Sequence, residues 1–142
     1  MKKTKKEIRR KVVHAGMIVR VPNFAKGGGL VPVVVVDKAT GKVLMLAYTR
    51  AKEFWETFYT HEAVFWSRSR KKRWKKGEEK SGNIFLIHEM YLDCDGDTLL
   101  YVVSQKNPDA GACHTGAPTC FSPIISAVLE RKGNTILEIV LL

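Results

Sequence analysis

The chain has 142 residues and a mass of 16.0 kDa, which is the size of a single domain. With 45% hydrophobic and 27% charged residues it has an ordinary globular composition, which excludes collagen-like, coiled-coil and wholly disordered chains. The net charge of +10 comes from two segments, because residues 2–11 hold seven Lys/Arg against one acid and residues 68–76 hold seven with no acid. Such segments favour phosphate-bearing partners, either nucleic acid or a phosphorylated small molecule.

The expected organisation is a basic N-terminal arm over residues 1–20, followed by a single domain over residues 21–142. No apolar run approaches the ~18–20 residues that a membrane span needs. The basic start also leads into no apolar signal-peptide core. We therefore expect a soluble, cytoplasmic protein.

The first half of the chain predicts a loop, a β-hairpin and a helix. Pro22 to Gly29 contains three consecutive glycines and is expected to be a loop. Leu30 to Asp37 is a continuous β-branched run, which predicts a strand buried on both faces, and Val43 to Tyr48 returns as its hairpin partner. Arg50 to Tyr59 has apolar residues at helical spacing, so it predicts the main helix.

The second half of the chain predicts strands separated by charged or irregular loops. Two loops are expected, over residues 68–81 and 106–119. The expected strands cover residues 63–67, 83–92, 98–104, 124–129 and 135–142, the last two as a closing hairpin. Strands dominate and one main helix lies near residues 50–60, so the predicted fold class is mainly β, of the α+β kind.

The most informative stretch is the acidic turn of residues 93–97. Because side chains alternate along an extended chain, Asp93, Asp95 and Asp97 would share one side and Cys94 would face the other. Three carboxylates at such short separations suit a hard cation such as Mg²⁺ or Ca²⁺. An EF-hand loop is excluded, because its required glycine and glutamate positions are occupied by Thr98 and Ser104. The alternative is a solvated acidic turn without a metal.

The three cysteines, Cys94, Cys113 and Cys120, suggest a second metal site. Zinc prefers thiolate and imidazole ligands, and three protein ligands would leave a position open for water, as in catalytic sites. His114 is adjacent to one of these cysteines and could serve as a base. Buried, inert thiols and an exposed histidine are the alternative.

A third feature is an aromatic and basic stretch near the middle of the chain. Aromatic rings interleaved with cations can stack on a base and pair with phosphate, so this stretch predicts a substrate-binding loop. A solvated basic loop is the alternative. The candidate substrate-binding residues are Trp66, Ser67, Arg68, Arg70, Trp74 and Lys76.

These three stretches, together and in this order, resemble phosphoribosyl-AMP cyclohydrolase, an enzyme family of histidine biosynthesis. The resemblance runs from about Phe24 to Phe121. It is carried by Gly29–Val33, Val43–Tyr48, Trp66–Arg70, Trp74–Glu78, Ser81–Asn83, Leu92–Asp97, and by Cys113-His114-Thr115-Gly116 followed by Cys120-Phe121.

The resemblance implies a small, mostly β pseudobarrel of mixed strands that forms a homodimer. It implies a catalytic Zn²⁺ bound by Cys94, Cys113 and Cys120, with thiolates from both subunits, and Mg²⁺ bound by Asp93, Asp95 and Asp97. The implied reaction is hydrolytic opening of the adenine ring of phosphoribosyl-AMP between N1 and C6, with His114 assisting proton transfer. The two phosphates of that substrate would be held by Arg68, Arg70 and Lys76, and its base would stack on Trp66 or Trp74.

The chain departs from the common family pattern at several positions. Ala117 and Pro118 stand where one or two basic residues are frequent, and Val36 and Phe85 stand where Gln is common. A usual Met-Asn pair is replaced by Thr49 and Arg50.

Two other functions remain open at this stage. One is a nucleic-acid-binding module that uses the basic arm and the loop of residues 68–76, although no RNP motif or zinc finger is present. The other is a related hydrolase that acts on another purine nucleotide.

Overall fold

The computed structural model describes residues 11–14, 16–123, 127–132 and 135–141. Strands make up most of the regular structure in the described chain, beside one α-helix and two short 3₁₀ turns, so the predicted mainly β class is confirmed for these residues. The elements in chain order are β1 (Lys11–His14), β2 (Met17–Arg20), η1 (Phe24–Gly27), β3 (Val31–Asp37), β4 (Val43–Thr49), α2 (Ala51–Thr60), β5 (Val64–Ser67), β6 (Lys72–Lys75), β7 (Phe85–Leu92), β8 (Leu99–Gln105), η2 (Pro108–Ala110), β9 (Ala127–Lys132) and β10 (Thr135–Leu141).

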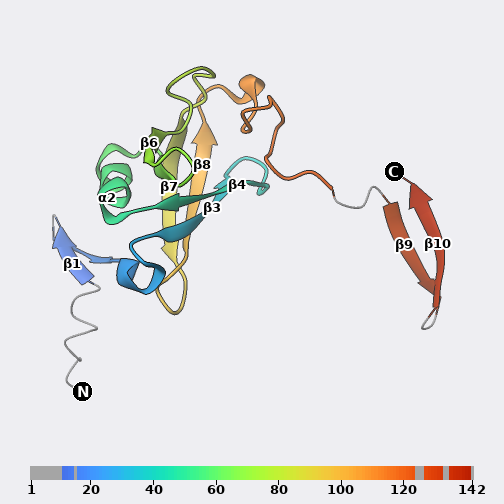
Figure 1. Cartoon of the computed structure of the whole chain (residues 1–142), viewed down its shortest axis with the longest axis horizontal. Coiled ribbons are helices and arrows are strands. Elements are labelled where there is room, and N and C mark those ends of the chain that lie inside the picture. The colour runs from blue at the N-terminus through green and yellow to red at the C-terminus, as the bar shows by residue number, and fades with distance from the viewer. Residues whose placement is uncertain (1–10, 15, 124–126, 133–134, 142) are drawn as a thin grey trace.

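A four-stranded mixed sheet in the order β4-β3-β8-β7 forms the body of the protein (Figure 1). β3 pairs antiparallel with β4, as the predicted hairpin requires, and parallel with β8. The second antiparallel pair, β7 with β8, closes through the acidic turn. β3 and β8, which are far apart in the sequence, therefore lie side by side at the centre of the sheet.

One face of this sheet carries the hydrophobic core, because alternate residues of each strand point to the same side. On β3 this face is formed by Val31, Val33, Val35 and Asp37, which are all buried. The residues between them are only half-buried, so the prediction of burial on both faces is wrong for the single chain. The second face is covered by no further layer among the described residues.

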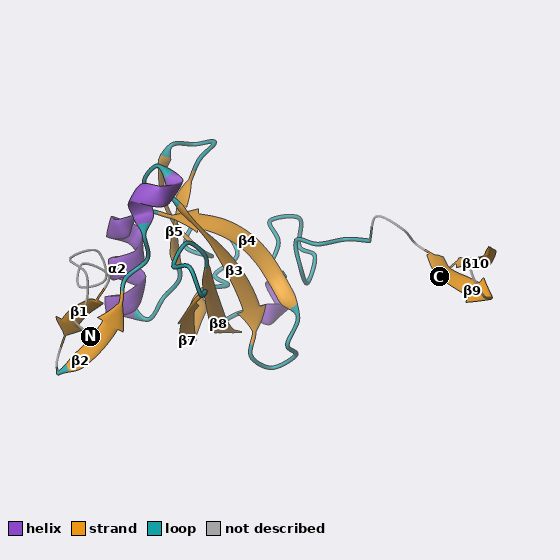
Figure 2. Cartoon of the chain, turned by 90° about the horizontal axis from the view of Figure 1, so that it is seen from below, coloured by secondary structure: helices purple, strands orange, loops and turns teal. Residues whose placement is uncertain are grey.

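Helix α2 packs against the core side of β4 and β5 (Figure 2). Its fully buried residues are Glu53, Phe54 and Thr57, a narrower stripe than the apolar spacing predicts. The Thr57 hydroxyl donates to the Val64 carbonyl at 3.1 Å and accepts from the Val64 amide at 3.0 Å, which fixes the helix to β5.

The predicted charged loop of residues 68–81 is wrong in part, because residues 72–75 form β6. β6 pairs antiparallel with β5 and places Trp74 opposite Phe65, with ring centroids 5.8 Å apart. Its cations face outward, where the Arg73 guanidinium pairs with the Glu56 carboxylate. A strand with one apolar residue and charge-compensated neighbours gives no hydrophobic alternation for sequence reasoning to find.

Two hairpins flank the body. β1 and β2 form one within the segment predicted as a basic arm, and residues 1–10 of that arm lie outside the described residues. β9 and β10 form the predicted closing hairpin, although residues 124–126, 133–134 and 142 of that prediction also lie outside the described chain. Both views show this hairpin standing away from the four-stranded sheet (Figures 1 and 2). No helix in the described part of the chain is both long and apolar enough to cross a membrane.

Candidate active site

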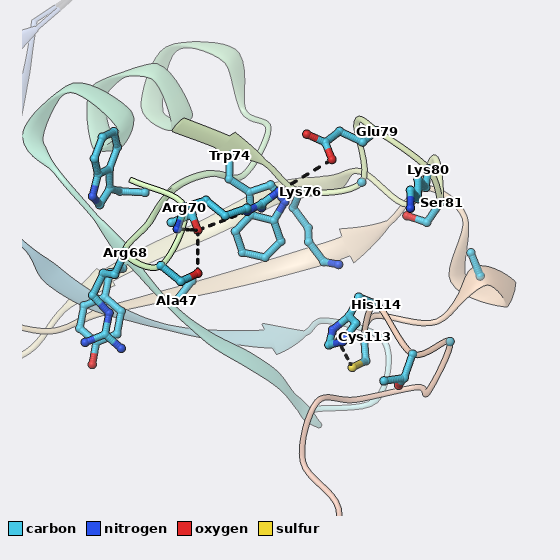
Figure 3. Close-up of a pocket in the computed structure, with 18 residues that line it drawn as sticks. Ala47, Arg68, Arg70, Trp74, Lys76, Glu79, Lys80, Ser81, Cys113 and His114 are labelled. Carbon is cyan, nitrogen blue, oxygen red and sulfur yellow. Dashed lines mark hydrogen bonds and ion pairs between the residues drawn. The ribbon is translucent and has the colours of Figure 1, made fainter. Parts of the chain in front are cut away.

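A cavity of about 1010 Å³ opens between the β5–β6 hairpin, the end of β4 and the loops of residues 77–81 and 110–116. The structure places all six predicted substrate-binding residues in its lining, together with Cys113 and His114 (Figure 3). This volume suits a small phosphorylated molecule, since ligand pockets typically measure roughly 300–1,000 Å³.

The β5–β6 turn presents the aromatic and basic side chains to the cavity. The Ser67 hydroxyl accepts a hydrogen bond from the Arg70 amide at 3.3 Å, and Lys71 adopts a left-handed φ of 51° to close the turn. This geometry places Arg68 and Arg70 on the turn, and Trp74 and Lys76 along the returning chain (Figure 3).

The cations of the cavity differ in how they are held. The Arg68 guanidinium lies 3.7 Å from the centroid of the Tyr48 ring, and the Arg70 guanidinium lies 3.8 Å from the Glu79 carboxylate. Lys76 is only 6% exposed, and its Nζ lies 5.7 Å from the Trp74 ring centroid. No carboxylate among the described residues forms a salt bridge with Arg68 or Lys76, so both charges are available to an anion.

Burial lowers the pKa of the Lys76 ammonium, although the thiols of Cys120 and Cys113 act in the opposite direction. The negative charge of a bound phosphate would stabilise the protonated ammonium. Lys76 is therefore a buried cation with no carboxylate partner in the described structure, in a cavity that can supply an anion.

Buried Asn83 ties the two loops of the cavity together. Its amide nitrogen donates to the Gly111 carbonyl and to the Gln105 side chain, both at 3.0 Å, and its amide oxygen accepts from the Asn107 backbone at 3.0 Å. Asn83 thus fixes the start of the loop that carries Cys113 and His114.

Two glycines allow these loops to approach closely. A Cβ at Gly77 would lie 2.3 Å from the Asn83 backbone, and a Cβ at Gly111 would lie 2.3 Å from the Gly116 carbonyl oxygen. Both residues also have φ near +80°, a conformation that side chains disfavour. The cavity wall therefore depends on glycine at both positions.

Cys113 and Cys120 interact across the loop of residues 113–120. Hydrogen bonds from Thr115, with smaller contributions from Cys120 and Lys76, lower the pKa of the Cys113 thiol. Partial burial of its sulfur, followed by the neighbouring Cys113, raises the pKa of the Cys120 thiol, although the residue as a whole is exposed. The Nδ1 atom of His114 lies 3.8 Å from the Cys113 sulfur. The Cys113 sulfur and the His114 imidazole therefore lie at one end of the cavity, and Cys120 interacts with Cys113.

Cys94 lies at the opposite end of β8 from the other two cysteines. It belongs to the turn that precedes the strand, whereas Cys113 and Cys120 belong to the loop that follows it (Figure 1). β8 has seven residues, and at ~3.3 Å per residue such a strand spans roughly 20 Å. Among the described residues the three sulfurs form no compact metal-ligand group. One chain alone does not bring the three predicted zinc ligands together.

The acidic turn does bring its predicted ligands together, because oxygen atoms of Asp93, Asp95 and Asp97 lie within 4.8 Å of one another. Asp93 Oδ1 accepts hydrogen bonds from the Asp97 amide at 3.0 Å and the Thr98 amide at 3.2 Å, which fixes the turn. Oxygen donors so close together fit a hard divalent cation.

Lys26, on η1, contacts the same carboxylates. Its Nζ lies 3.1 Å from the Asp95 carboxylate and 2.7 Å from the Asp97 carboxylate. The hydrogen bond from Lys26 is the main cause that lowers the pKa of the Asp97 carboxyl to about 2. An internal ammonium ion thus offsets part of the negative charge of the turn.

Sequence reasoning did not assign site roles to Lys26, Tyr48 or Lys80, and treated Asn83 only as part of a motif. Lys80 lines the cavity on the side away from Arg68 (Figure 3). The Ser81-Gly82-Asn83 motif was the available signal for the buried amide network. Tyr48 ends one of the stretches that carry the resemblance, but nothing in that stretch indicates its contact with Arg68. Lys26 carried no local signal, because its contacts are with residues far along the chain.

Comparison with known proteins identifies relatives of this chain. The sequence model of a family described as phosphoribosyl-AMP cyclohydrolase matches residues 45–122. A phosphoribosyl-AMP cyclohydrolase of Chlorobium phaeobacteroides is 47% identical over 104 residues, which cover 73% of this chain and 73% of the relative. Proteins of the same name from Clostridium botulinum and Bacillus cereus are 45% identical over 104 residues and 48% identical over 100 residues. These alignments cover 73% and 70% of this chain, and 91% and 93% of the respective relatives.

Proposed function

Because the chain belongs to the phosphoribosyl-AMP cyclohydrolase family, we propose that it opens the adenine ring of phosphoribosyl-AMP by hydrolysis between N1 and C6, as a cytoplasmic enzyme of histidine biosynthesis. The observation that carries the proposal is the cavity itself. It combines cations without carboxylate partners in the described structure, aromatic rings, and a thiol–imidazole cluster at one end.

The cavity suits a substrate with a phosphate group on either side of a purine. Arg68 and Lys80 lie on opposite sides of the drawn cavity, with Trp74 and Lys76 between them (Figure 3). Cations at separated positions can each hold one phosphate, and an aromatic ring between them can contact the base. The phosphoribosyl group on N1 makes the purine cationic, which makes C6 electrophilic.

The reaction adds water across one bond. The water oxygen bonds to C6 and becomes the oxygen of a carboxamide as the N1–C6 bond breaks. Water therefore gives up two protons: one is released to solvent and removes the positive charge of the ring, and the other is delivered to N1. We assign this proton transfer to His114, whose imidazole is exposed and lines the cavity. The 3.8 Å contact with the Cys113 sulfur holds the ring near the thiol pair.

A zinc ion fits thiolate donors such as the two cysteines of this loop. Cys113 and Cys120 would hold it, and when bound it would make water more acidic and so provide a nucleophile near neutral pH. The third ligand, Cys94, lies at the other end of β8, so we propose that a second copy of the chain supplies it.

A two-fold arrangement meets this need. In a symmetric pair whose axis is perpendicular to β8, the two β8 strands run in opposite directions, so the start of one lies beside the end of the other. Cys94 of the second copy would then approach Cys113 and Cys120 of the first. Cys94 and Cys120 are both exposed in the single chain, as this arrangement requires.

The second face of the sheet supports the same dimer. Val43, Leu46 and Tyr91 are exposed on it by 43%, 47% and 55%, beside half-buried residues of β3 and β8. Contiguous apolar surface of this kind marks interaction sites. Cys120 donates its amide to the Leu44 carbonyl at 2.8 Å, so the thiol pair adjoins this face.

We further propose that the acidic turn binds Mg²⁺ through Asp93, Asp95 and Asp97. Their oxygen atoms are already close together, and their charge is only partly offset by Lys26. The bound ion would supply positive charge that can attract a substrate phosphate.

The nucleic-acid-binding alternative is disfavoured by the pairing of the central basic segment. Arg70, Lys72, Arg73 and Lys75 each lie within ion-pair distance of a glutamate. A surface whose charges are already paired releases few counterions on binding nucleic acid. Weak binding through the N-terminal basic residues would be detected as an affinity that falls steeply with salt and survives chelation of metals.

The direct test is turnover. Purified protein supplied with Zn²⁺ and Mg²⁺ is mixed with phosphoribosyl-AMP, and the ultraviolet absorbance is followed as the ring opens. Chelator-treated protein is the control. We expect a rate that depends on metal, and no turnover by the loaded protein would refute the assignment. Turnover of another purine nucleotide instead would favour the related-hydrolase alternative.

The shared zinc site has its own test. Cys94→Ala and Cys113→Ala homodimers should each lack activity, because each lacks one ligand in both sites. A mixed dimer of the two variants contains one intact site if ligands come from both subunits, so activity should return on mixing. No recovery in verified mixed dimers would contradict the shared site and leave the turnover assignment intact.

A further inference from the structure

The N-terminus of α2 contains an ion pair with a buried carboxylate that the catalytic assignment does not use. Glu53 is fully buried in the first turn of the helix, and Arg50 is the residue that precedes the helix. The Arg50 Nε donates to Glu53 Oε2 at 2.9 Å, and Nη2 donates to Oε1 at 2.6 Å. Two parallel hydrogen bonds of this kind fix the plane of the guanidinium as well as its position.

The guanidinium plane lies against an aromatic wall of the cavity. Its central carbon is 3.5 Å from the centroid of the Trp66 ring, and Trp66 lines the cavity. This is the shortest cation–ring contact among the described residues. Glu53, Arg50 and Trp66 thus form a continuous chain of contacts from the core to the cavity.

The charges of this chain of contacts are balanced internally. Burial alone would raise the pKa of the Glu53 carboxyl. Hydrogen bonds from Arg50 and the backbone, together with the charges of Arg50 and Lys52, outweigh burial, so the pKa of Glu53 lies below its usual value. Glu53 is therefore ionised near neutral pH and Arg50 is neutralised. Arg68 differs, because it stacks on Tyr48 without a carboxylate partner among the described residues.

We propose that Arg50 and Glu53 are positioning residues that hold the Trp66 indole as a fixed wall of the substrate cavity. Arg50 covers one face of the indole, and the ring itself lines the cavity that would receive a phosphorylated nucleotide. This inference rests on the proposed function for its substrate, but its geometry stands independently.

The place of Arg50 at the start of the helix favours contacts away from the helix backbone. Helix N-caps are usually short polar residues whose side chains bond to the first turn. The Arg50 side chain makes no N-cap hydrogen bond to the helix backbone. Its donors bond to Glu53 instead, and its plane lies on Trp66.

The first experiment separates charge from planar stacking. Arg50→Met removes both, whereas Arg50→Lys retains the charge but not the plane. For both variants we expect KM for phosphoribosyl-AMP to rise roughly fivefold, with kcat within about twofold of the unsubstituted chain. Glu56→Gln, which removes the partner of Arg73 on the same helix, is the matched control and should leave both constants unchanged. Restoration of KM by Arg50→Lys would overturn the proposal.

A double-variant comparison tests whether Arg50 acts through Trp66. In a Trp66→Leu background the ring is absent, so Arg50→Met should raise KM no further. An additional increase equal to that in the unsubstituted chain would overturn the proposal. If Arg50→Met unfolds because Glu53 is left buried and unpaired, Arg50→Met combined with Glu53→Leu removes both charges and serves in its place.

A readout without turnover distinguishes failure of this inference from failure of the proposed function. Acrylamide quenching of Trp66 fluorescence reports how firmly the ring is held. The Trp66 signal is the part of the fluorescence that the Trp66→Phe variant lacks. We expect the quenching constant to rise about twofold in Arg50→Met and Arg50→Lys, and to be unchanged in Glu56→Gln. An unchanged constant in the Arg50 variants would refute the positioning role even if the chain hydrolyses phosphoribosyl-AMP. A raised constant would support it even if that substrate were not turned over.

Discussion

The two candidate metal sites lie at opposite ends of β8 and are assembled in different ways. The acidic turn before the strand brings three carboxylates together within one short loop, and a hydrogen bond to Asp93 fixes that loop from inside. The loop after the strand brings together only Cys113 and Cys120. This loop is held by a hydrogen bond from Asn83 to the Gly111 carbonyl, and these two residues are 28 positions apart in the sequence. One site is complete within a single chain, and the other lacks a ligand.

The difference shows which site depends on the rest of the molecule. A turn whose ligands lie within five residues needs only its own backbone geometry to close. A cluster assembled from distant loops needs the sheet, the buried amide network and, in our proposal, a second subunit. Changes in the body should therefore affect the thiol cluster strongly and the acidic turn weakly.

The largest effect is expected from removing a thiol. Cys113→Ala should abolish zinc binding and lower kcat/KM by at least about 1,000-fold, because a zinc ligand and the water it acidifies are lost together. Zinc content by elemental analysis and steady-state rates provide the measurement. Mg²⁺ affinity of the acidic turn should not change. A variant that keeps zinc and activity would contradict the ligand role.

The amide network should give the next largest effect. Asn83→Ala leaves the Asn107 amide and the Gly111 carbonyl without their partners, so the free energy of unfolding should fall by about 2–4 kcal/mol. Denaturant unfolding measures the loss, and zinc affinity should fall with it. Asn107→Ala, which removes an exposed hydrogen bond to the Ser81 carbonyl, is a milder control. Equal losses of Mg²⁺ and zinc affinity in Asn83→Ala would break the distinction between the two sites.

Much of the fold could be predicted because its signals are local. The β-branched run of β3, the apolar spacing of α2 and the turn residues between strands all depend on neighbours in the sequence. β6 was missed because its stability comes from pairing with β5 and from ion pairs to Glu56 and Glu79. Those partners lie on other elements, so no pattern within residues 72–75 could indicate a strand.

The same distinction applies to the candidate sites. The acidic turn was predictable as a cluster because alternation along one short segment places its aspartates together. The separation of Cys94 from Cys113 and Cys120 follows from β8, which lies between them. The predicted strand of residues 98–104 already indicated it. The contact of Arg50 with Trp66 was not predictable, because it depends on how α2 meets β5 and neither residue alone indicates it.

The acidic turn itself can be tested by removing one carboxylate. Asp97→Asn should lower Mg²⁺ affinity at least about tenfold, because a charged oxygen ligand is replaced by a neutral one. Isothermal titration calorimetry measures the change. Zinc content should remain as in the unsubstituted chain. Asp109→Asn, an exposed aspartate in another loop, is the control and should leave Mg²⁺ affinity unchanged. No loss in Asp97→Asn would contradict the Mg²⁺ assignment.

The low pKa of Asp97 predicts a smaller effect on stability at acid pH. Lys26 holds this pKa at about 2 in the folded protein, whereas an aspartate in an unfolded chain titrates near ~3.9. Because the folded value is the lower one, the contribution is present above about pH 4 and is lost as the pH falls through about 2. Metal-free Asp97→Asn should therefore lose less of its unfolding free energy across that window. Denaturant unfolding at several pH values checks this, and an equal loss in both proteins would count against the Lys26 contact.

The smallest effect should come from removing the internal cation of the acidic turn. Lys26 Nζ contacts two of the carboxylates that the proposed Mg²⁺ would use, so the ammonium and the metal compete for the same charge. Lys26→Met should raise Mg²⁺ affinity by about threefold, since exposed ion pairs are individually weak. Lys38→Met, in the β3–β4 turn, controls for the general loss of one positive charge and should raise affinity much less. A fall in Mg²⁺ affinity on removing Lys26 would contradict this competition and indicate that Lys26 orders the turn for the metal. The acidic site would then depend on η1, and its contrast with the thiol cluster would be weaker.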